Sequence, residues 1–221
     1  MTMNIRFYPF RAVALGLALL LSGLSVQQTV QAQSAEDLIQ RMQQRYPSTS
    51  TFQIDFAQTL TSDFTDESIT LEGQALLSGD RFAITLPNQQ IISDGTTLWL
   101  FDASTQQVLV NDVAAQEGLS LNAMLIDFDR HYRVTSVESL VDDGVLYHAL
   151  DVAPKGDDSV FASARLWLRD RDNEVARIEA TDYSENRTTF VLTNTRFAMT
   201  TPPNAFTYTP PTGVEVVDLR N

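Results

Sequence analysis

From Thr51 onward, hydrophobic and polar residues alternate along most of the chain with a period of two. The first segment places Phe52, Ile54 and Phe56 on one side and polar residues between them. This alternation is typical of a strand that buries one face of a sheet. Turn-forming clusters such as Asp94-Gly95 divide the pattern into short segments. Further strands are predicted at 69–75, 82–86, 90–93, 97–101, 107–110, 132–140, 145–152, 160–168, 175–180, 188–197 and 206–209.

Short turns between successive segments indicate a meandering antiparallel sheet of about 10–11 strands. Such a sheet has one apolar face, and the sequence offers few helices that could cover it. The apolar face therefore has two ways of being buried: the sheet curls into a barrel, or it holds an apolar ligand.

A helix is predicted just before the first strand. Ser34 is a suitable N-cap residue, and acidic residues follow it in the first turn. Leu38, Met42 and Tyr46 then lie on one face, and Pro47 ends the segment.

A second helix is predicted within 119–126, where apolar residues recur at positions 121, 124 and 125. Its place between the two halves of the sheet leaves two interpretations open. It is a plug that belongs to the ordinary core, or it is a movable lid over a ligand cavity.

The N-terminus has the pattern of a secretory signal peptide. Arg6 and Arg11 precede an apolar run at 12–24, and Val30-Gln31-Ala32 resembles a cleavage site. The run is shorter than the roughly 20 residues that span a bilayer. No Cys follows it, so lipid attachment there is excluded. We therefore expect a signal peptide at 1–32 and a single untethered domain at 33–221 in the periplasm.

The charge balance is strongly acidic. The chain has 15 Lys and Arg against 28 Asp and Glu, a net charge of −13, and Lys155 is its single lysine. Because residues 1–32 contain two Arg and no acidic residue, the part from 33 onward carries −15. Such a surface repels nucleic acid and anionic lipid. It is also typical of proteins adapted to high salt.

Candidate catalytic chemistry is sparse. The chain has no Cys, which excludes disulfides, thiol catalysis and cysteine metal sites. His131 and His148 both fall in strand-like patterns and are interpreted as structural. The run 170–174 resembles half of a calcium loop, but it lacks the central Gly and is interpreted as a hairpin turn. We expect neither an enzyme nor a cofactor or metal.

Five blocks, in order, resemble the periplasmic outer-membrane lipoprotein carriers, the LolA-like proteins. The most specific is Ile92-Ser93-Asp94-Gly95-Thr96-Thr97-Leu98-Trp99, in which Asp-Gly forms a turn and Trp99 enters the next strand. The others are Ser50 to Gln58, Glu72-Gly73, Ala123 to Ile126 and Phe206 to Val214. The resemblance extends from about residue 35 to the C-terminus.

This resemblance implies an incomplete antiparallel barrel whose apolar side is covered by short helices. It also implies three kinds of partner: acylated lipoproteins, an inner-membrane lipoprotein-releasing ABC transporter and an outer-membrane acceptor. By position, the acyl-chain cavity is expected to be lined by Met42, Phe52, Phe56, Phe82, Ile84, Ile92, Trp99, Leu121, Met124 and Leu125. The carrier is expected to be monomeric.

One block departs from the family. Proteobacterial members have Lys-Arg-Pro before the third strand, and its Arg holds the lid closed. Here the stretch is Ser78-Gly79-Asp80-Arg81-Phe82. Arg81 is therefore either a shifted lid latch or an ordinary exposed hairpin residue. A binder of free lipids or glycolipids, a lipid-sensing regulator and an enzyme on the same fold are the alternative functions.

Overall fold

The computed structural model describes residues 34–65, 67–113, 121–156 and 159–220. The predicted signal peptide and the predicted start of the second helix at 118–120 lie outside these ranges. The helices are α1 (Ala35–Arg45), α2 (Leu121–Leu125) and α3 (Phe128–His131). The strands are β1 (Thr51–Thr61), β2 (Ser68–Ser78), β3 (Arg81–Thr85), β4 (Gln89–Ser93), β5 (Thr97–Asp102), β6 (Gln107–Asp112), β7 (Tyr132–Asp142), β8 (Val145–Pro154), β9 (Phe161–Arg169), β10 (Val175–Asp182), β11 (Arg187–Arg196) and β12 (Glu215–Asp218).

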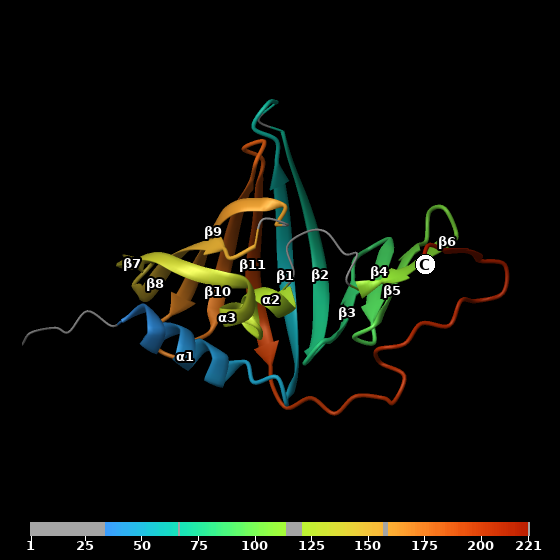
Figure 1. Ribbon diagram of the computed structural model, residues 1–221, viewed down its shortest axis with the longest axis horizontal. Coiled ribbons are helices and arrows are strands. Elements are labelled where there is room, and N and C mark those ends of the chain that lie inside the picture. The colour runs from blue at the N-terminus through green and yellow to red at the C-terminus, as the bar shows by residue number, and fades with distance from the viewer. Residues whose placement is uncertain (1–33, 66, 114–120, 157–158, 221) are drawn as a thin grey trace, which may run out of the picture. The chain divides into compact units, whose positions relative to one another are not determined.

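The twelve strands of the described ranges belong to one sheet in the order β12-β6-β5-β4-β3-β2-β1-β11-β10-β9-β8-β7. Neighbouring strands are antiparallel except β12 and β6, which are parallel. The sheet ends at β12 on one side and β7 on the other, so it remains open (Figure 1). The predicted mainly-β fold with an incomplete antiparallel barrel is confirmed.

One face of the sheet carries the core. In β1, Phe52, Ile54 and Phe56 are 0, 0 and 5 % exposed, and the residues between them face the other way. Helices α1, α2 and α3 lie over this same face (Figure 1), and Leu38 and Met42 of α1 pack into the same cluster. Burying a side chain of this size stabilises the fold by about 1.5–3 kcal/mol. We call this side the inner face of the sheet.

Local sequence signals have the predicted structures. Ser34 caps α1, since its hydroxyl accepts the backbone N–H of Asp37 at 3.1 Å. The Asp94 carboxylate accepts the N–H groups of Thr96 and Thr97 at 2.9 and 2.8 Å. Gly95 follows with φ +96°, a backbone conformation that favours glycine. The Asp-Gly turn therefore fixes the pairing of β4 with β5.

The C-terminal region differs from the prediction. Residues 206–209 do not form a strand: residue 206 ends a turn and 207–209 have no regular structure, since prolines at 202, 203, 210 and 211 remove backbone donors on both sides. The last strand is β12, which pairs in parallel with β6 and has an almost fully exposed side-chain pattern. Periodicity could not predict it, because it has no buried face. The four-residue α3 was also not predicted.

Candidate ligand cavity and its lid

An apolar pocket of about 150 Å³ lies on the inner face at the junction of the two halves of the sheet. Strands β1, β2, β3, β4 and β11 form its floor and walls, and α2 covers it. Its lining is Phe56, Gln58, Leu77, Phe82, Ile84, Leu86, Ile91, Leu121, Asn122 and Phe190. Eight of these ten side chains are apolar, so the pocket suits a hydrocarbon group. We call it the apolar pocket.

Two aromatic rings and one glycine form one wall of the apolar pocket. The Phe56 and Phe190 rings have centroids 5.8 Å apart with an interplanar angle of 59°. Gly73 pairs with Phe56 across β1 and β2, and a Cβ there would lie 2.6 Å from the Phe56 Cζ atom. Glycine at position 73 therefore allows the Phe56 ring to approach β2 closely.

Helix α2 covers the apolar pocket with Leu121 and Asn122, and its other buried side chains lie in the adjoining core. Leu121, Met124 and Leu125 are 4, 0 and 0 % exposed. Asn122 is also buried, and its side-chain amide donates to the carbonyl of Gly79, in the β2–β3 turn, at 2.6 Å. The Asn122 Oδ1 atom has no hydrogen-bond partner among the described residues. The Asn122 side chain thus joins the covering helix to the β2–β3 turn with its amide, while its Oδ1 atom accepts no hydrogen bond from the described residues.

Helix α1, in contrast, is anchored by several contacts at its C-terminal end. The Tyr46 hydroxyl accepts the N–H of Val175 at 3.1 Å, and burial raises the pKa of that hydroxyl far above its ordinary value. Arg45 forms an ion pair with Glu174 and lies 3.6 Å above the Phe197 ring. These contacts join α1 to β10 and to the segment after β11, so α1 belongs to the fixed framework.

The family model described as "Outer membrane lipoprotein carrier protein LolA" matches residues 47–209, well over half of the chain. The chain belongs to the LolA family. An outer-membrane lipoprotein carrier protein of Chromobacterium violaceum is 28 % identical over 73 % of this chain and 82 % of its own length. One of Bordetella pertussis is 33 % identical over 63 % of this chain and 65 % of its own length.

A solved structure with the same fold is an uncharacterized conserved protein from Thermus thermophilus. It matches 84 % of this chain and 99 % of its own length with a TM-score of 0.55 and 12 % sequence identity. At this identity the likeness supports the fold and nothing more.

The cavity residues expected from the LolA resemblance lie in three different parts of the structure. Phe56, Phe82, Ile84 and Leu121 line the apolar pocket. Another four lie in the adjoining core, where they are at most 1 % exposed: Met42, Phe52, Met124 and Leu125. The pocket also uses residues that the sequence analysis missed. These are Gln58, Leu77, Leu86, Ile91, Asn122 and Phe190.

Ile92 and Trp99 lie on the opposite face of the sheet from the apolar pocket. The register pairs Ile92 with Ala83 and with Trp99, whereas Ile91 pairs with Ile84. Because directly paired residues share a face, Ile91 turns inward with Ile84, and Ile92 turns outward with Trp99. Because Ile91 and Ile92 are identical neighbours, the sequence does not indicate which of them faces inward. Ile92 was expected in the cavity, but Ile91 lines the apolar pocket.

Arg81 makes its contacts away from α2. Its guanidinium donates to the Ser78 hydroxyl at 3.2 Å and lies 4.8 Å from the centre of the Phe206 ring. Phe206 belongs to the C-terminal segment, so Arg81 joins that segment to the β2–β3 turn. The side chain of this LolA-family chain that joins α2 to the same turn is Asn122, through its bond to Gly79.

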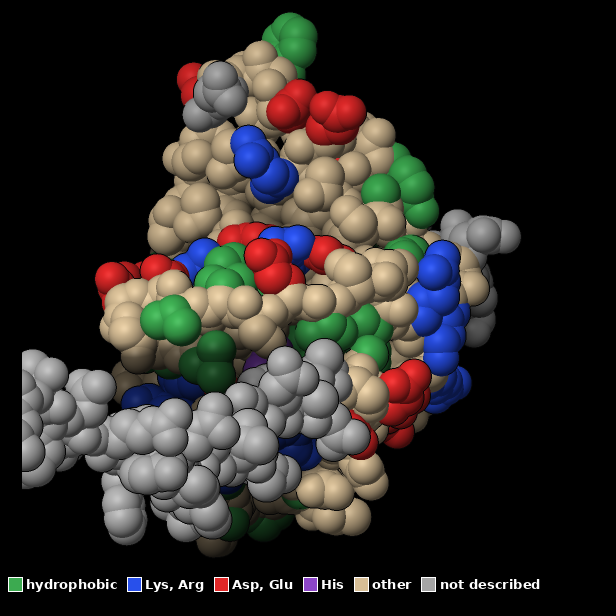
Figure 2. Space-filling view, turned by 90° about the vertical axis from the view of Figure 1, so that its left-hand side faces the viewer, with side chains coloured by type: hydrophobic (Ala, Val, Ile, Leu, Met, Phe, Trp, Pro, Cys, Tyr) green, Lys and Arg blue, Asp and Glu red, His purple; other side chains and the backbone are tan. Residues whose placement is uncertain are grey.

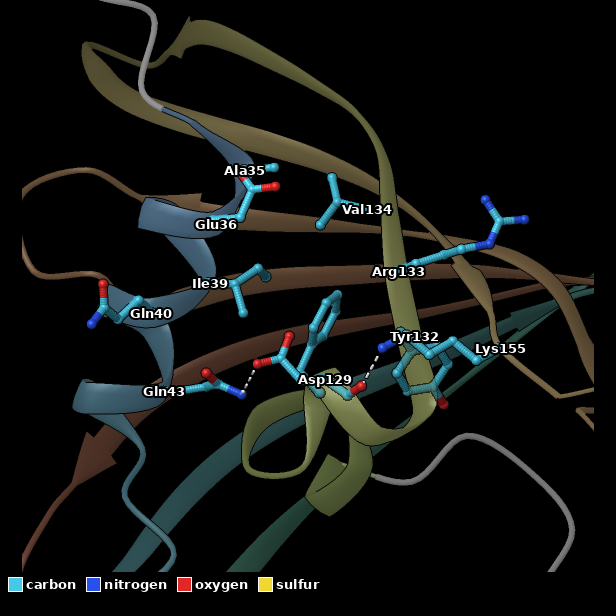
Figure 3. A pocket seen from close by; sticks show the side chains of 11 residues that line it. Ala35, Glu36, Ile39, Gln40, Gln43, Asp129, Tyr132, Arg133, Val134 and Lys155 are labelled. Atoms are coloured by element: carbon cyan, nitrogen blue, oxygen red, sulfur yellow. Dashed lines mark hydrogen bonds between the residues drawn. The ribbon is translucent and has the colours of Figure 1, made fainter.

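A second, more polar pocket of about 490 Å³ lies between α1, α3 and β7 (Figure 3). Ile39 and Val134 contribute apolar surface, but the rim is polar. Gln43 donates to the Asp129 carboxylate at 3.1 Å, and Lys155 donates to the Asp129 backbone carbonyl. These hydrogen-bonded groups make the pocket a poor match for an acyl chain.

His148, expected to be structural, is buried and hydrogen-bonded on both ring nitrogens. Nδ1 lies 2.9 Å from the Ser139 hydroxyl and Nε2 lies 2.9 Å from the Asp170 carboxylate. The residue types are those of a hydrolase triad, but the two ring nitrogens are exchanged relative to that arrangement, and none of the three residues lines the apolar pocket. Ser139 and His148 are direct partners across β7 and β8, so the chain of hydrogen bonds joins β7, β8 and the β9–β10 turn.

No group of three or more His, Asp and Glu residues in the described ranges is placed to hold a metal ion. In the same part of the chain, no helix has the length and apolar character needed to cross a bilayer.

Proposed function

We propose that this LolA-family chain is a periplasmic carrier that takes acylated lipoproteins from an inner-membrane ABC transporter to an acceptor at the outer membrane. The observation that carries the proposal is the apolar pocket on the inner face, closed by α2 and lined almost entirely by hydrocarbon and aromatic side chains. The carrier acts as a monomer and makes or breaks no covalent bond, so its role requires no cofactor.

Hydrophobic energetics explain why such a cargo needs a carrier. Exposing an acyl chain to water costs about 0.8 kcal/mol for each CH₂ group. A lipoprotein therefore stays in its membrane unless another apolar surface covers its chains. The apolar pocket supplies that surface, and the acidic exterior of the chain, with 28 Asp and Glu against 15 Lys and Arg, disfavours lasting adhesion to anionic headgroups.

Loading requires α2 to move. The apolar pocket has about 150 Å³, which is below the roughly 300–1,000 Å³ of an ordinary small-molecule site. A lipoprotein carries more than one acyl chain, so on this proposal the apolar pocket must enlarge to take its cargo. Displacing Leu121 and Asn122, the two α2 residues that line the apolar pocket, would enlarge it. A lid with two states of similar free energy makes both binding and release possible.

Export completes the proposal. We infer that residues 1–32 are a cleaved signal peptide and that the domain at 33–221 is the working carrier. Analysis of the N-terminus of the protein recovered from the periplasm tests this point, and a start near residue 33 is expected.

The cargo itself is tested by purifying the protein from its native envelope and identifying bound molecules by mass spectrometry. Diacylated or triacylated polypeptides are the expected result, and free lipids or glycolipids alone would overturn the proposal. A functional arm measures release of lipoproteins from spheroplasts. Phe82→Glu and Met124→Glu are expected to abolish release, provided that circular dichroism shows both variants folded.

A further inference from the structure

Apolar side chains are exposed at the end of the β1–β2 hairpin. Phe64, in the turn, is 96 % exposed, and Ile69 and Leu60 beside it are 65 and 42 % exposed. Tyr183, in the β10–β11 turn, is 67 % exposed. Figure 2 shows a hydrophobic side chain standing clear at the top, the end to which this hairpin reaches in Figure 1. We call Leu60, Phe64, Ile69 and Tyr183 the tip cluster.

The two turns that carry the tip cluster are joined to each other. The backbone N–H of Asp63 donates to the side-chain carbonyl of Asn186 at 3.3 Å. Within the β10–β11 turn, the Asp182 carboxylate accepts the N–H of Ser184 at 2.8 Å and the amide of Asn186 at 2.9 Å. The aromatic residues at 64 and 183 are therefore presented together by neighbouring, hydrogen-bonded turns.

The tip cluster is continuous with the wall of the apolar pocket. The register of β1 with β2 pairs Phe56 with Gly73, Gln58 with Leu71 and Leu60 with Ile69. Alternate pairs share a face, so Leu60 and Ile69 lie on the same inner face as Phe56, roughly 13 Å further along the strand. Exposure rises along this line, from 5 % at Phe56 to 42 % at Leu60 and 96 % at Phe64. A mostly apolar lane, interrupted by Gln58, thus leads from the pocket toward the tip.

We propose that the tip cluster seats in the surface of a zwitterionic lipid bilayer and that the Leu60–Ile69 lane is the path by which acyl chains pass between that bilayer and the apolar pocket. The direction of the lane rests on the carrier function. The membrane contact itself is a property of the protein alone and is tested without cargo.

The shape and chemistry of the tip favour a bilayer over a protein groove. The exposed side chains stand on projecting turns, and aromatic residues prefer the interface between headgroups and acyl chains. Asp63, Glu67 and Glu185 are exposed around them, so an anionic surface would be repelled and insertion would stay shallow. Contact through so few apolar side chains is weak and reversible, as a shuttling carrier requires.

Vesicle flotation tests the contact with protein recovered from the periplasmic fraction, whose N-terminus is verified by mass spectrometry. The probe is a vesicle of phosphatidylcholine and phosphatidylethanolamine. The double variant Phe64→Ser with Tyr183→Ser is expected to reduce the bound fraction about tenfold. Val216→Ser is the matched control, because Val216 is an apolar side chain, 51 % exposed, on β12 at an edge of the sheet; its binding should equal that of the wild type.

Adding phosphatidylglycerol to the vesicles is expected to weaken binding at low ionic strength, and salt should restore it. The proposal would be overturned if the wild type did not bind vesicles, or if the double variant bound them equally well. The tip cluster would then be assigned to contact with a protein partner.

A separate titration with a fluorescent fatty acid, without vesicles, reports on the apolar pocket. Unchanged fatty-acid binding by the double variant supports a role confined to the membrane. If the wild type bound no fatty acid, the carrier function would fail, whereas the vesicle result would stand.

Discussion

Asn122 in α2 and Gly79 in the β2–β3 turn are joined by a 2.6 Å hydrogen bond from the side-chain amide to the backbone carbonyl. The donor is 8 % exposed, and Gly79 has φ +57°. The bond connects the helix that covers the apolar pocket to the framework that forms the pocket floor. In the proposed carrier, this bond would favour the closed position of α2.

Asn122→Ala is expected to favour the open state. Loss of a buried hydrogen bond of this kind costs about 1 kcal/mol, which corresponds to roughly fivefold faster amide hydrogen exchange in α2. Exchange measured by mass spectrometry over 121–125 checks this, together with faster uptake of a fluorescent fatty acid. Arg81→Ala is the control, because Arg81 contacts Ser78 and Phe206 instead of α2. If Arg81→Ala accelerated hydrogen exchange in α2 as much as Asn122→Ala does, the Asn122 bond would not be the specific contact that holds α2 in place.

The sequence was most informative where one face of a strand is buried. Alternation at Phe52, Ile54 and Phe56 identified β1, and the Asp94-Gly95 turn located the β4–β5 hairpin. The alternation left a closed barrel and a ligand-holding sheet as alternatives, and the open sheet was predicted only through the resemblance to the LolA family.

The residues of the apolar pocket were predicted less completely than the fold, and individual residues show the physical reasons. In the Ile91-Ile92 doublet, either residue could face inward, and only the pairing register decides between them. Asn122 lies in an apolar helix and has no pattern that indicates a bond to a distant turn. Phe190 reaches the pocket because β11 pairs with β1, and that pairing joins strands far apart in the sequence.

Ile84→Glu and Ile92→Glu form a matched test of which face holds the cargo. The two residues have the same type and lie on neighbouring strands, but Ile84 lines the apolar pocket and Ile92 faces the other side. A carboxylate at 84 would sit among hydrocarbon groups, where its burial is strongly unfavourable. Fatty-acid binding is therefore expected to be lost for Ile84→Glu and retained for Ile92→Glu. Loss of binding in both folded variants would contradict the assignment of faces.

Gly73→Ala is expected to damage the pocket wall and the fold together. The added methyl group would lie 2.6 Å from the Phe56 Cζ atom and 2.9 Å from the Thr85 carbonyl oxygen. The ring can turn away, but the backbone oxygen cannot move without shifting β3. We expect a loss of about 1–3 kcal/mol in the free energy of unfolding and weaker fatty-acid binding. Urea denaturation checks the first, and Glu72→Ala, on the opposite face and exposed, is the control.

Asp151 and Arg165 give stability a dependence on acidic pH that is separate from the lid. Two hydrogen bonds join them, at 2.6 and 2.8 Å. The bonds from Arg165 hold the pKa of the Asp151 carboxyl below its ordinary value of 3.8, although partial burial opposes them. The contribution is therefore fully present above about pH 4 and is lost as the pH falls from there toward the lowered pKa.

Asp151→Asn is expected to unfold at lower urea than the wild type at pH 7, and the difference should shrink as the pH falls below 4. The effect will be small, because both side chains are 35 % exposed and solvent screens the pair. Asp143→Asn is the control, since Asp143 is an exposed turn residue at φ +47°, a conformation that Asn tolerates. A difference between wild type and Asp151→Asn that stayed constant from pH 7 to pH 3 would show that the ion pair does not cause it. Fatty-acid binding should be unchanged in both variants, because neither residue lines the apolar pocket.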